Sequence, residues 1–263
     1  MSQSTFRPGL LEGTTVLITG GGTGICRGIA EAYARLGAKV CIVSRKLEVL
    51  EQTASEIREA TGAEIIAASA DVRDFDAVSA AMQLAIETFG GLDTVICGAA
   101  GNFLAPAAMI SPKGFRTVVE IDLLGTFHTC RAAFETLKAS GRGLVINISA
   151  TLQYGGTPLQ GHAAAAKAGI DALTRNLAVE WGGVGIRTCA IAPGPIGDTE
   201  GMKRLAPGEV GEKLAKKIPL GRFGRIAEIA DMAVFLRSPS ADYITGAIMV
   251  VDGGESISGL GLT

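Results

Sequence analysis

Several features that mark particular classes of protein are missing from the 263-residue sequence. Its five cysteines lie far apart and form no Cys-x-x-Cys pair, so neither a zinc site nor a disulfide framework follows, and we expect a reducing compartment. Its apolar stretches all fall short of the roughly 18 residues that a transmembrane helix needs. The first residues carry neither a secretory signal nor a transit-peptide pattern, and the last three differ from a Ser-Lys-Leu peroxisomal address. We therefore expect a cytoplasmic protein that crosses no membrane.

Charge of one sign is not in excess either. Lysine and arginine number 24 against 26 aspartates and glutamates, and the net charge of −2 provides no general attraction to nucleic acid or to an anionic membrane. The two histidines lack the spacing of a metal site, so we expect no metal. Apolar residues make up 48% and charged residues 19% of the chain, a balance that excludes intrinsic disorder. An anionic ligand must then be held by local groups.

The chain is rich in short β-branched runs that alternate with longer helical stretches. The runs are mostly apolar throughout, which indicates strands buried on both faces of a parallel sheet. Strands are expected at residues 14–19, 39–44, 64–69, 93–97, 143–149, 186–191 and 247–252, and helices at 24–36, 47–61, 74–89, 114–140, 161–181 and 225–236. The pattern predicts a single Rossmann-like α/β domain over residues 1–263, with a doubly wound parallel sheet of about seven strands and helices on both faces. The mixed Gly, Pro and Lys content of residues 194–221 suggests a mobile flap over the site.

A glycine-rich turn follows the first expected strand and opens the first expected helix. Glycines let the backbone approach a pyrophosphate closely, and a helix N-terminus offers free N–H groups and the positive end of its dipole. The second strand ends about 20 residues later, as in dinucleotide-binding proteins. The cofactor-binding residues predicted in this turn are Gly20, Gly21, Gly22, Thr23, Gly24 and Ile25. The alternative is a tight strand-to-helix turn that binds nothing.

The second expected strand ends in Ser44, Arg45 and Lys46, where an NAD enzyme would place an acidic residue on the ribose. A guanidinium at this position pairs with a 2′-phosphate and stacks on adenine, so the sequence favours NADP(H), with Arg45 and Lys46 as its ligands. The alternative is a solvated basic turn. Asp71, after the third strand, either meets the adenine edge or caps the helix that starts near residue 74.

Six motifs together resemble the short-chain dehydrogenase/reductase family over essentially the whole chain. They are the turn of residues 19–25, Asp71-Val72, Ala99-Ala100-Gly101, Asn147-Ile148-Ser149, Lys167 and Pro193-Gly194. That family usually works with a Ser, a Tyr and a Lys, the Tyr four residues before the Lys and the Ser thirteen before the Tyr. Counted back from Lys167, these positions hold Ala163 and Ala150, so both hydroxyls are missing. Two further departures are Asp122, where Asn is common, and Cys26, where the turn usually has its last glycine.

A subgroup of that family, the peroxisomal-type 2,4-dienoyl-CoA reductases, lacks the phenol and uses an aspartate. The sequence resembles this subgroup in residues 100–103, 120–122, 162–163, 193–196 and 199–201. The resemblance implies a homotetramer that reduces a 2,4-dienoyl-CoA to a 3-enoyl-CoA with NADPH in unsaturated fatty acid degradation, and it makes the peroxisomal matrix an alternative compartment. The cofactor contacts that it implies, besides those above, are Asp71, Val72, Lys167, Pro193, Gly194, Ile196 and Thr199. The substrate-binding residues that it implies are Arg45, Arg73, Asn102, Phe103, Ser111 and Arg204.

The catalytic residues expected from this resemblance are Asp122 and Lys167. A conjugated dienoyl thioester accepts hydride at its far carbon and moves charge onto the thioester oxygen, after which the alpha carbon is protonated. A carboxylic acid acting through water can supply that proton. We expect burial among apolar neighbours to raise the pKa of Asp122, and a nearby Lys167 to oppose that shift. Lys167 is expected to hydrogen bond the nicotinamide ribose, and its alternative is a solvated surface lysine. The alternative for Asp122 is a buried carboxylate bonded to backbone N–H groups.

Three other residues keep two interpretations each. Tyr154 is a rival acid or an interfacial or core tyrosine, His162 touches substrate or fills space, and Arg27 faces phosphate or solvent. The rival functions are another NADP-dependent enoyl-CoA or 3-oxoacyl reductase, against which the missing phenol argues, and a catalytically silent NADP-binding scaffold, against which Lys167 and Asp122 argue. The sequence thus predicts an oxidoreductase that takes an acyl-CoA substrate.

Overall fold

The protein is built on a seven-stranded sheet, as the sequence predicts. The computed structural model describes residues 5–205 and 208–258, and of residues 203–205 it describes the backbone alone. The strands are β1 (Thr15–Thr19), β2 (Lys39–Ser44), β3 (Ile65–Ser69), β4 (Thr94–Cys97), β5 (Gly143–Ile148), β6 (Ile186–Pro193) and β7 (Ile248–Val251). They lie in the order β3-β2-β1-β4-β5-β6-β7, and every neighbouring pair is parallel. The order reverses between β1 and β4, which is where open α/β sheets bind their ligands.

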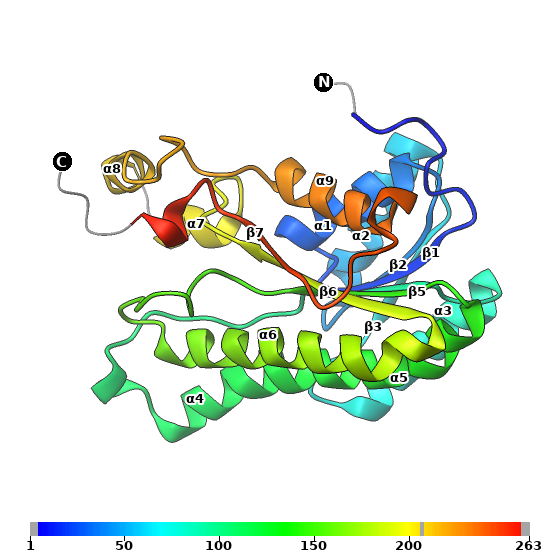
Figure 1. Ribbon diagram of the computed structural model, residues 1–263, viewed down its shortest axis with the longest axis horizontal. Helices are drawn as coiled ribbons and strands as arrows, with labels where there is room; N and C mark the ends of the chain where they lie inside the picture. The colour runs from blue at the N-terminus through cyan, green and yellow to red at the C-terminus, as the bar shows by residue number, and fades with distance from the viewer. Residues whose placement is uncertain (1–4, 206–207, 259–263) are drawn as a thin grey trace.

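Helices cover both faces of the sheet (Figure 1). One face carries α1 (Gly24–Arg35), α2 (Leu47–Thr61) and α9 (Ile226–Arg237), and the other carries α3 (Phe75–Phe89), α5 (Gly125–Ser140) and α6 (Gly161–Trp181). Successive side chains of a strand point to opposite faces. Val16 and Ile18 therefore belong to the core under α1 and α9, and Leu17 belongs to the core under α3 and α5. The doubly wound α/β fold with two buried sheet faces is confirmed.

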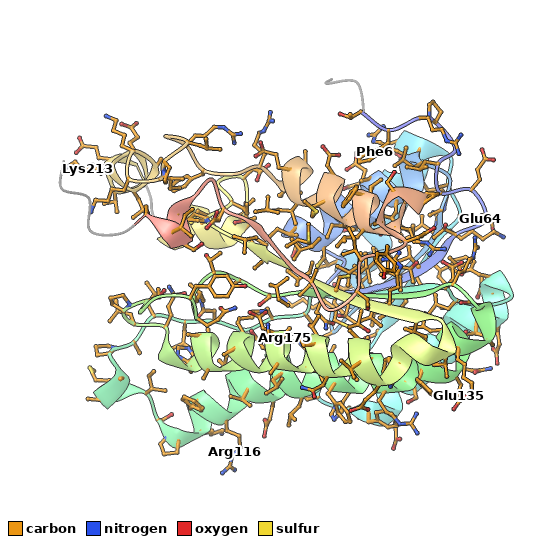
Figure 2. All side chains as sticks on the ribbon, viewed as in Figure 1. Phe6, Glu64, Arg116, Glu135, Arg175 and Lys213 are labelled. Carbon is orange, nitrogen blue, oxygen red and sulfur yellow. The ribbon has the colours of Figure 1, made fainter. Side chains whose placement is uncertain are left out.

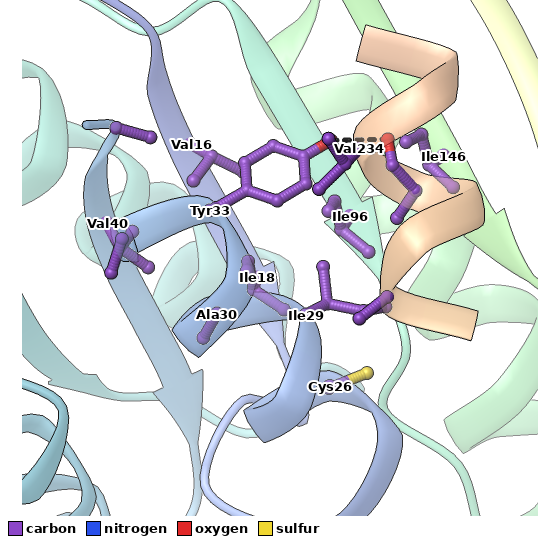
Figure 3. Close-up of a cluster of buried hydrophobic side chains, with 14 of the residues drawn as sticks. Val16, Ile18, Cys26, Ile29, Ala30, Tyr33, Val40, Ile96, Ile146 and Val234 are labelled. Atoms are coloured by element: carbon purple, nitrogen blue, oxygen red, sulfur yellow. Dashed lines mark hydrogen bonds between the residues drawn. The ribbon is translucent and has the colours of Figure 1, made fainter. Parts of the chain in front are cut away.

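Tyr33 joins α1 to α9 inside the first of these cores. Its side chain is fully buried, and its hydroxyl donates a hydrogen bond of 2.9 Å to the carbonyl of Ala233 (Figure 3). Figure 3 shows the ring beside Val16 of β1, with Ile18 and Ile29 in the same apolar layer. A buried hydroxyl without a partner would cost about 1 to 3 kcal/mol. The bond lets a phenol occupy this layer and ties α9 to the helix that begins at the glycine-rich turn.

The long helix expected over residues 114–140 is interrupted. It starts earlier than expected, because Ser111 caps α4 (Pro112–Val119). A π-helical turn, Glu120–Leu124, then separates α4 from α5. The predicted helix is present over residues 112–140, but the sequence does not indicate the π turn within it, since apolar spacing does not register one extra residue in a turn. Such turns inside α-helices are frequent at functional sites, and this one carries Asp122.

Two short helices occupy the stretch for which the sequence predicts a flap. After β6, Ile196 pairs with Gly224 in an isolated bridge, and α7 (Glu200–Leu205) and α8 (Glu209–Ala215) follow. Figure 1 shows both helices beyond the carboxyl end of β6. That this stretch moves over the site stays a prediction.

The outer surfaces of the helices carry the charged side chains. Arg116 of α4, Glu135 of α5 and Lys213 of α8 are exposed and point away from the sheet (Figure 2). Over the described ranges, no helix combines the length and the apolar character needed to cross a membrane.

Candidate active site

The loops that follow β1, β4 and β5 meet at one edge of the sheet. The hydroxyl of Thr19, the last residue of β1, accepts hydrogen bonds from the backbone N–H groups of Gly98 at 3.1 Å and Ala99 at 3.4 Å. In an α/β sheet the crevice outside the carboxyl ends of the strands is the usual ligand site. The candidate site lies at this edge, and the π turn and α6 pack beside it.

Two glycines of the glycine-rich turn, Gly20 and Gly21, leave no room for side chains. Gly20 has a φ of +74°, and a Cβ there would come within 2.8 Å of the Gly98 carbonyl oxygen. A Cβ on Gly21 would lie 2.7 Å from an isoleucine of β2. The N-cap of α1, Thr23, makes no side-chain capping bond with the described residues, so the N–H groups of the turn that starts at Gly24 stay available. Such a cradle fits a pyrophosphate.

The first turn of α1 packs closely although Cys26 stands where a glycine is usual. Cys26, which follows Ile25, is buried. Its side chain fits because residue 98 is a glycine, since a Cβ on Gly98 would collide with Cys26 Sγ. Burial raises the pKa of Cys26 to about 12, so the sulfur stays a neutral thiol beside the cradle. The next residue, Arg27, donates to Glu56 of α2 at 2.6 Å. The two side chains are 41% and 42% exposed, so Arg27 is paired at the protein surface.

The carboxyl end of β2 lies beside the glycine-rich turn. A Cβ on Gly22 would lie 3.8 Å from Ser44 Oγ, and the next two residues, Arg45 and Lys46, are exposed. Neither cation forms an ion pair within the part of the chain that the structure describes. Both are therefore available to an anionic ligand that lies in the cradle.

Arg73 is held by Asp71 at the carboxyl end of β3. Its Nη2 and Nε donate to the two carboxylate oxygens at 2.5 and 3.0 Å. These bonds, with a further contribution from the charge of Arg45, hold the pKa of Asp71 below its ordinary value. Asp71 does not cap the following helix, because Asp74 does. Val72, between the paired residues, is buried.

Asp122 and Lys167 form a buried charged pair. Asp122 is 1% exposed and Lys167, on α6, is 7% exposed. Asp122 Oδ1 accepts from the backbone N–H of Gly101 at 2.7 Å, and its Oδ2 lies 3.5 Å from Lys167 Nζ. Lys167 Nζ also donates to the carbonyl of Ile148, at the end of β5, at 2.9 Å. An ammonium has three N–H donors, so Lys167 keeps one for a ligand.

Burial raises the pKa of Asp122, while the positive charge of Lys167 and the Gly101 hydrogen bond oppose that shift. The directions are those expected from the sequence. The backbone N–H occupies Oδ1 only, so the second oxygen faces Lys167 and any ligand beside it. A carboxyl whose pKa is raised can act as a general acid.

A second buried carboxylate, which the sequence analysis missed, orders the loop after β5. Asp171 lies one turn after Lys167 on α6 and accepts from Ser149 Oγ at 2.6 Å, Gln153 Nε2 at 2.7 Å and the Tyr154 hydroxyl at 3.2 Å. Burial and this carboxylate raise the pKa of Tyr154 to about 12, which favours the structural interpretation of the tyrosine. An acidic residue four positions after Lys167, on the buried face of the helix, was the available signal.

The residues expected near the thioester gather at the start of α6. Phe103 stacks on His162 with ring centroids 4.2 Å apart, and it is 41% exposed. Asn102 donates to Gln160 at 2.6 Å. The backbone N–H of Gly114 donates to Ser111 Oγ. A Cβ on Gly114 would lie 3.2 Å from both Phe103 Cζ and Ser111 Oγ, so the side chains of Phe103 and Ser111 are neighbours.

The segment after β6 contributes the remaining predicted contacts. Pro193 ends β6, and Gly194 follows it. Ile196 is buried, and its carbonyl accepts from the hydroxyl of Thr199 at 2.8 Å. Arg204 belongs to α7, but its side chain lies outside the described part of the chain.

Many of the predicted residues, together with Ser44 and His162, form three groups. We call residues 20–25 with 44–46 the cofactor cradle, Asp122 with Lys167 the acid pair, and Phe103, Ser111 and His162 the substrate mouth. A dinucleotide cradle beside a buried carboxyl–ammonium pair, on a doubly wound sheet, defines the class as a dinucleotide-binding α/β oxidoreductase.

Comparison with known proteins narrows the class to a family. A family model described as enoyl-(acyl carrier protein) reductase matches residues 20–256. The crystal structure of a short chain dehydrogenase from Bacillus anthracis matches with a TM-score of 0.83 and 40% identity, over 92% of this chain and 96% of that one. The chain belongs to the short-chain dehydrogenase/reductase family, and it is an oxidoreductase that uses a nicotinamide cofactor.

Two relatives cover nearly the whole chain. The peroxisomal 2,4-dienoyl-CoA reductase of Saccharomyces cerevisiae, named as (3E)-enoyl-CoA-producing, is 48% identical over 257 residues, or 97% of this chain and 88% of the yeast protein. A probable 2,4-dienoyl-CoA reductase of Bacillus subtilis, named as (2E)-enoyl-CoA-producing, is 42% identical over 248 residues, or 93% of this chain and 97% of the bacterial one. The two names differ in where the product keeps its double bond.

Proposed function

We propose that the protein reduces 2,4-dienoyl-CoA thioesters with NADPH and releases 3-enoyl-CoA. The observation that carries the proposal is the acid pair, buried where Ala150 and Ala163 offer no hydroxyl. A carbonyl reductase must protonate an oxygen, whereas a reduced dienoyl thioester must be protonated on carbon, for which a carboxyl acting through water suffices. The names of the yeast and Bacillus subtilis relatives support this class of substrate.

The cofactor cradle fits NADP(H). The glycine-rich turn and the free N–H groups of α1 would hold the pyrophosphate, and Arg45 with Lys46 would hold the 2′-phosphate. The third N–H of Lys167 suits a hydroxyl of the nicotinamide ribose. When bound, the cofactor supplies the hydride. Further contacts to it are proposed for Asp71, Val72, Pro193, Gly194, Ile196 and Thr199.

The acid pair performs the remaining chemistry. Once the far carbon of the diene has gained hydride, an electron pair moves through the double bonds to the thioester oxygen. Asp122, whose pKa burial raises, delivers a proton through a water to the alpha carbon. Lys167 adds positive charge near the developing oxyanion. Protonation at the alpha carbon leaves the double bond between carbons 3 and 4, whereas protonation two carbons further along would give the 2-enoyl product.

The acyl-CoA is proposed to run from the substrate mouth toward the arginines after β2 and β3. Phe103 and Ser111, which are neighbours, would lie near the thioester end, and Asn102 would also contact the substrate. Arg73 is engaged by Asp71, so contact with a phosphate of CoA requires Arg73 to exchange that partner. Arg45 and Arg204 complete the proposed path.

The test follows NADPH absorbance with 2,4-hexadienoyl-CoA, crotonyl-CoA and acetoacetyl-CoA in parallel. Oxidation with the dienoyl thioester alone is expected. Oxidation with one of the other two would make the protein a 2-enoyl-CoA or 3-oxoacyl reductase, and oxidation with none despite NADPH binding would make it a silent scaffold. Proton NMR of the product locates the double bond, which we expect between carbons 3 and 4.

We also propose that the protein works as a homotetramer. Phe115, Leu124 and Phe127 follow one another along α4, the π turn and α5, and they are 41%, 43% and 44% exposed. Exposed apolar side chains that lie together mark surfaces that a partner covers. Closed symmetric assemblies of identical chains are the commonest solution to such exposure.

The compartment of the protein stays a prediction, with the cytoplasm expected and the peroxisomal matrix as the alternative. The name of the yeast relative supports the peroxisomal alternative for this chain. Co-localisation of a fluorescent fusion, tagged at either end in turn, with a peroxisomal marker decides between the two.

A further inference from the structure

His162 is buried without a hydrogen-bonding partner. Its side chain is 0% exposed, and neither Nδ1 nor Nε2 bonds to any described residue. An imidazole carries at least one N–H donor, and buried polar groups in folded proteins are nearly always paired. The other histidine, His128, follows that rule, because its Nδ1 lies 2.9 Å from the carbonyl oxygen of Val72. The unpaired imidazole therefore points to a ligand as its partner.

The imidazole belongs to the substrate mouth and stands on the same helix as Lys167 of the acid pair. It is the second residue of α6 and precedes Ala163. Its ring stacks on Phe103 with 34° between the planes, and the backbone N–H of Gly101, two residues before Phe103, donates to Asp122. A ligand group beside this ring thus shares its space with the proposed acid and with the proposed thioester contacts.

The proposed reaction needs a hydrogen-bond donor at this place. Reduction of a dienoyl thioester develops negative charge on the thioester oxygen before the alpha carbon is protonated, and enzymes stabilise such charge with preorganised donors. The positions that carry hydroxyl donors elsewhere in the family are Ala150 and Ala163 here. Lys167 already donates to Ile148 and faces Asp122. Within the described part of this site, His162 supplies the buried donor that has no partner.

We propose that His162 donates an imidazole N–H to the thioester oxygen of the bound substrate. The inference rests on the proposed function. The N–H bond stays intact throughout. The hydride and its electron pair form the first new C–H bond at the far carbon, and the displaced π electrons of the diene shift toward the carbonyl and leave a pair on the thioester oxygen. When that pair returns to restore the carbonyl, the alpha carbon forms the second new C–H bond with a proton from Asp122. NADPH is oxidised to NADP⁺ and the diene is reduced to a single double bond. Stacking on Phe103 orients the ring that makes this contact.

Three variants separate hydrogen bonding from packing. His162→Phe keeps a flat ring against Phe103 and removes both nitrogens. His162→Asn and His162→Gln place an amide N–H near the positions of Nδ1 and Nε2, so the one that restores activity identifies the donating nitrogen. Loss of one oxyanion donor typically lowers turnover about 100- to 1000-fold. We expect that loss in kcat for the Phe variant, recovery to within about tenfold of the parent in one amide variant, and NADPH affinity within about twofold in all three.

A spectroscopic readout tests the contact without turnover. A hydrogen bond at the thioester oxygen polarises the conjugated system and shifts its ultraviolet absorption to longer wavelength. We expect this shift when 2,4-hexadienoyl-CoA binds the NADP⁺ complex of the parent, and its loss in His162→Phe. A parent without the shift, or a Phe variant that keeps both the shift and the parent's kcat, overturns the proposal. A parent that shows the shift but does not oxidise NADPH with this thioester overturns the proposed function and leaves the contact standing.

Thermal unfolding distinguishes this role from a structural one. Replacing an unpaired buried polar group by an apolar group of the same shape is neutral or stabilising. We expect His162→Phe to unfold at the temperature of the parent or above it. A fall of about 10 °C or more would assign the imidazole a structural role and overturn the proposal.

Discussion

Asp122 and Asp71 belong to the same site, yet their neighbours move their pKa values in opposite directions. Burial raises the pKa of Asp122, whereas the hydrogen bonds from Arg73 hold that of Asp71 below its ordinary value. Residue type alone does not distinguish an acid from a permanently ionised carboxylate. The assignment of the proton donor therefore depends on contacts that only the folded chain provides.

The first prediction concerns Asp122→Asn, which keeps the shape and the bond from Gly101 but removes the acid. Loss of a general acid should lower kcat by about 100- to 10,000-fold, with NADPH affinity unchanged. Steady-state rates with 2,4-hexadienoyl-CoA and NADPH fluorescence titration measure both quantities. Tyr154→Phe is the matched control, and it should retain nearly the parent's rate because its hydroxyl serves Asp171.

The pH dependence gives a second measurement of the same group. Asp122 donates only when protonated, and its pKa is raised, so kcat should be fullest below that pKa and fall as pH rises through it. The residual activity of Asp122→Asn should lack this fall. An active Asn variant together with an inactive Tyr154→Phe variant would make Tyr154 the acid.

Arg45 carries the expected preference for NADPH. Arg45→Asp replaces a cation without an ion pair among the described residues by an anion at the end of β2. The lost charged hydrogen bond and the new repulsion should weaken NADPH binding by about 2 to 4 kcal/mol. Titration with NADPH and NADH measures the change, and the affinity for NADH should change far less. Equal NADPH affinity in parent and variant would disprove the cofactor assignment.

The site residues divide according to whether a local pattern marks them. The cradle, Asp122 and Lys167 stand in short motifs, so the sequence alone is enough to propose them. The hydrogen bonds of Asp171, and the lack of one at His162 among the described residues, are decided by which residues from other parts of the chain surround them. Spacing in the sequence does not reveal those neighbours. Arg73 is expected on the substrate path, but the sequence does not specify the hydrogen bonds that its guanidinium makes to Asp71.

Among elements, strands were easier to predict than the helix that carries Asp122. Runs that are apolar throughout mark strands buried on both faces, and all seven lie close to their expected positions. The stretch over residues 114–140 keeps a helical spacing of apolar residues through the π turn, so its irregularity leaves no mark in the pattern. Gly125, directly after that turn, lies so close to Val72 that a Cβ there would stand 2.5 Å from Val72 Cγ2. This close contact joins residues that are distant in the chain, so the local sequence around the π turn does not predict it.

The contact between α1 and the loop after β4 gives an element-scale prediction. Gly98→Ala should lower the free energy of unfolding by about 1 to 3 kcal/mol, because the new methyl meets Cys26 Sγ. In a Cys26→Ala background the sulfur is absent, so the same substitution should cost less, and the double variant should lose less than the two single variants together. Urea unfolding of the four proteins measures the cycle. Strict additivity would show that Cys26 and Gly98 do not compensate each other.

At the scale of the whole molecule, the exposed apolar side chains along α4 and α5 predict self-association. Analytical ultracentrifugation at micromolar concentration should show a species of four chains instead of the 26.9 kDa single chain. Phe127→Asp places a charge at a side chain that is 44% exposed, and it should dissociate the assembly. A parent that sediments as one chain would remove the homotetramer, and a Phe127→Asp variant that stays assembled would move the interface to another face.

The reversal of strand order also has a consequence for how the protein refolds. β1 pairs with β2, the next strand in the chain, but its other neighbour, β4, begins at Thr94, on the far side of three helices and two strands. Pairings between segments distant in the chain form late, because loop-closure entropy opposes them until other contacts exist. The cradle belongs to the β1–β2 side of this pairing and the acid pair to the β4–β5 side. On dilution from urea, helical circular dichroism should therefore return before NADPH fluorescence enhancement, and simultaneous recovery in one phase would show that both sides form together.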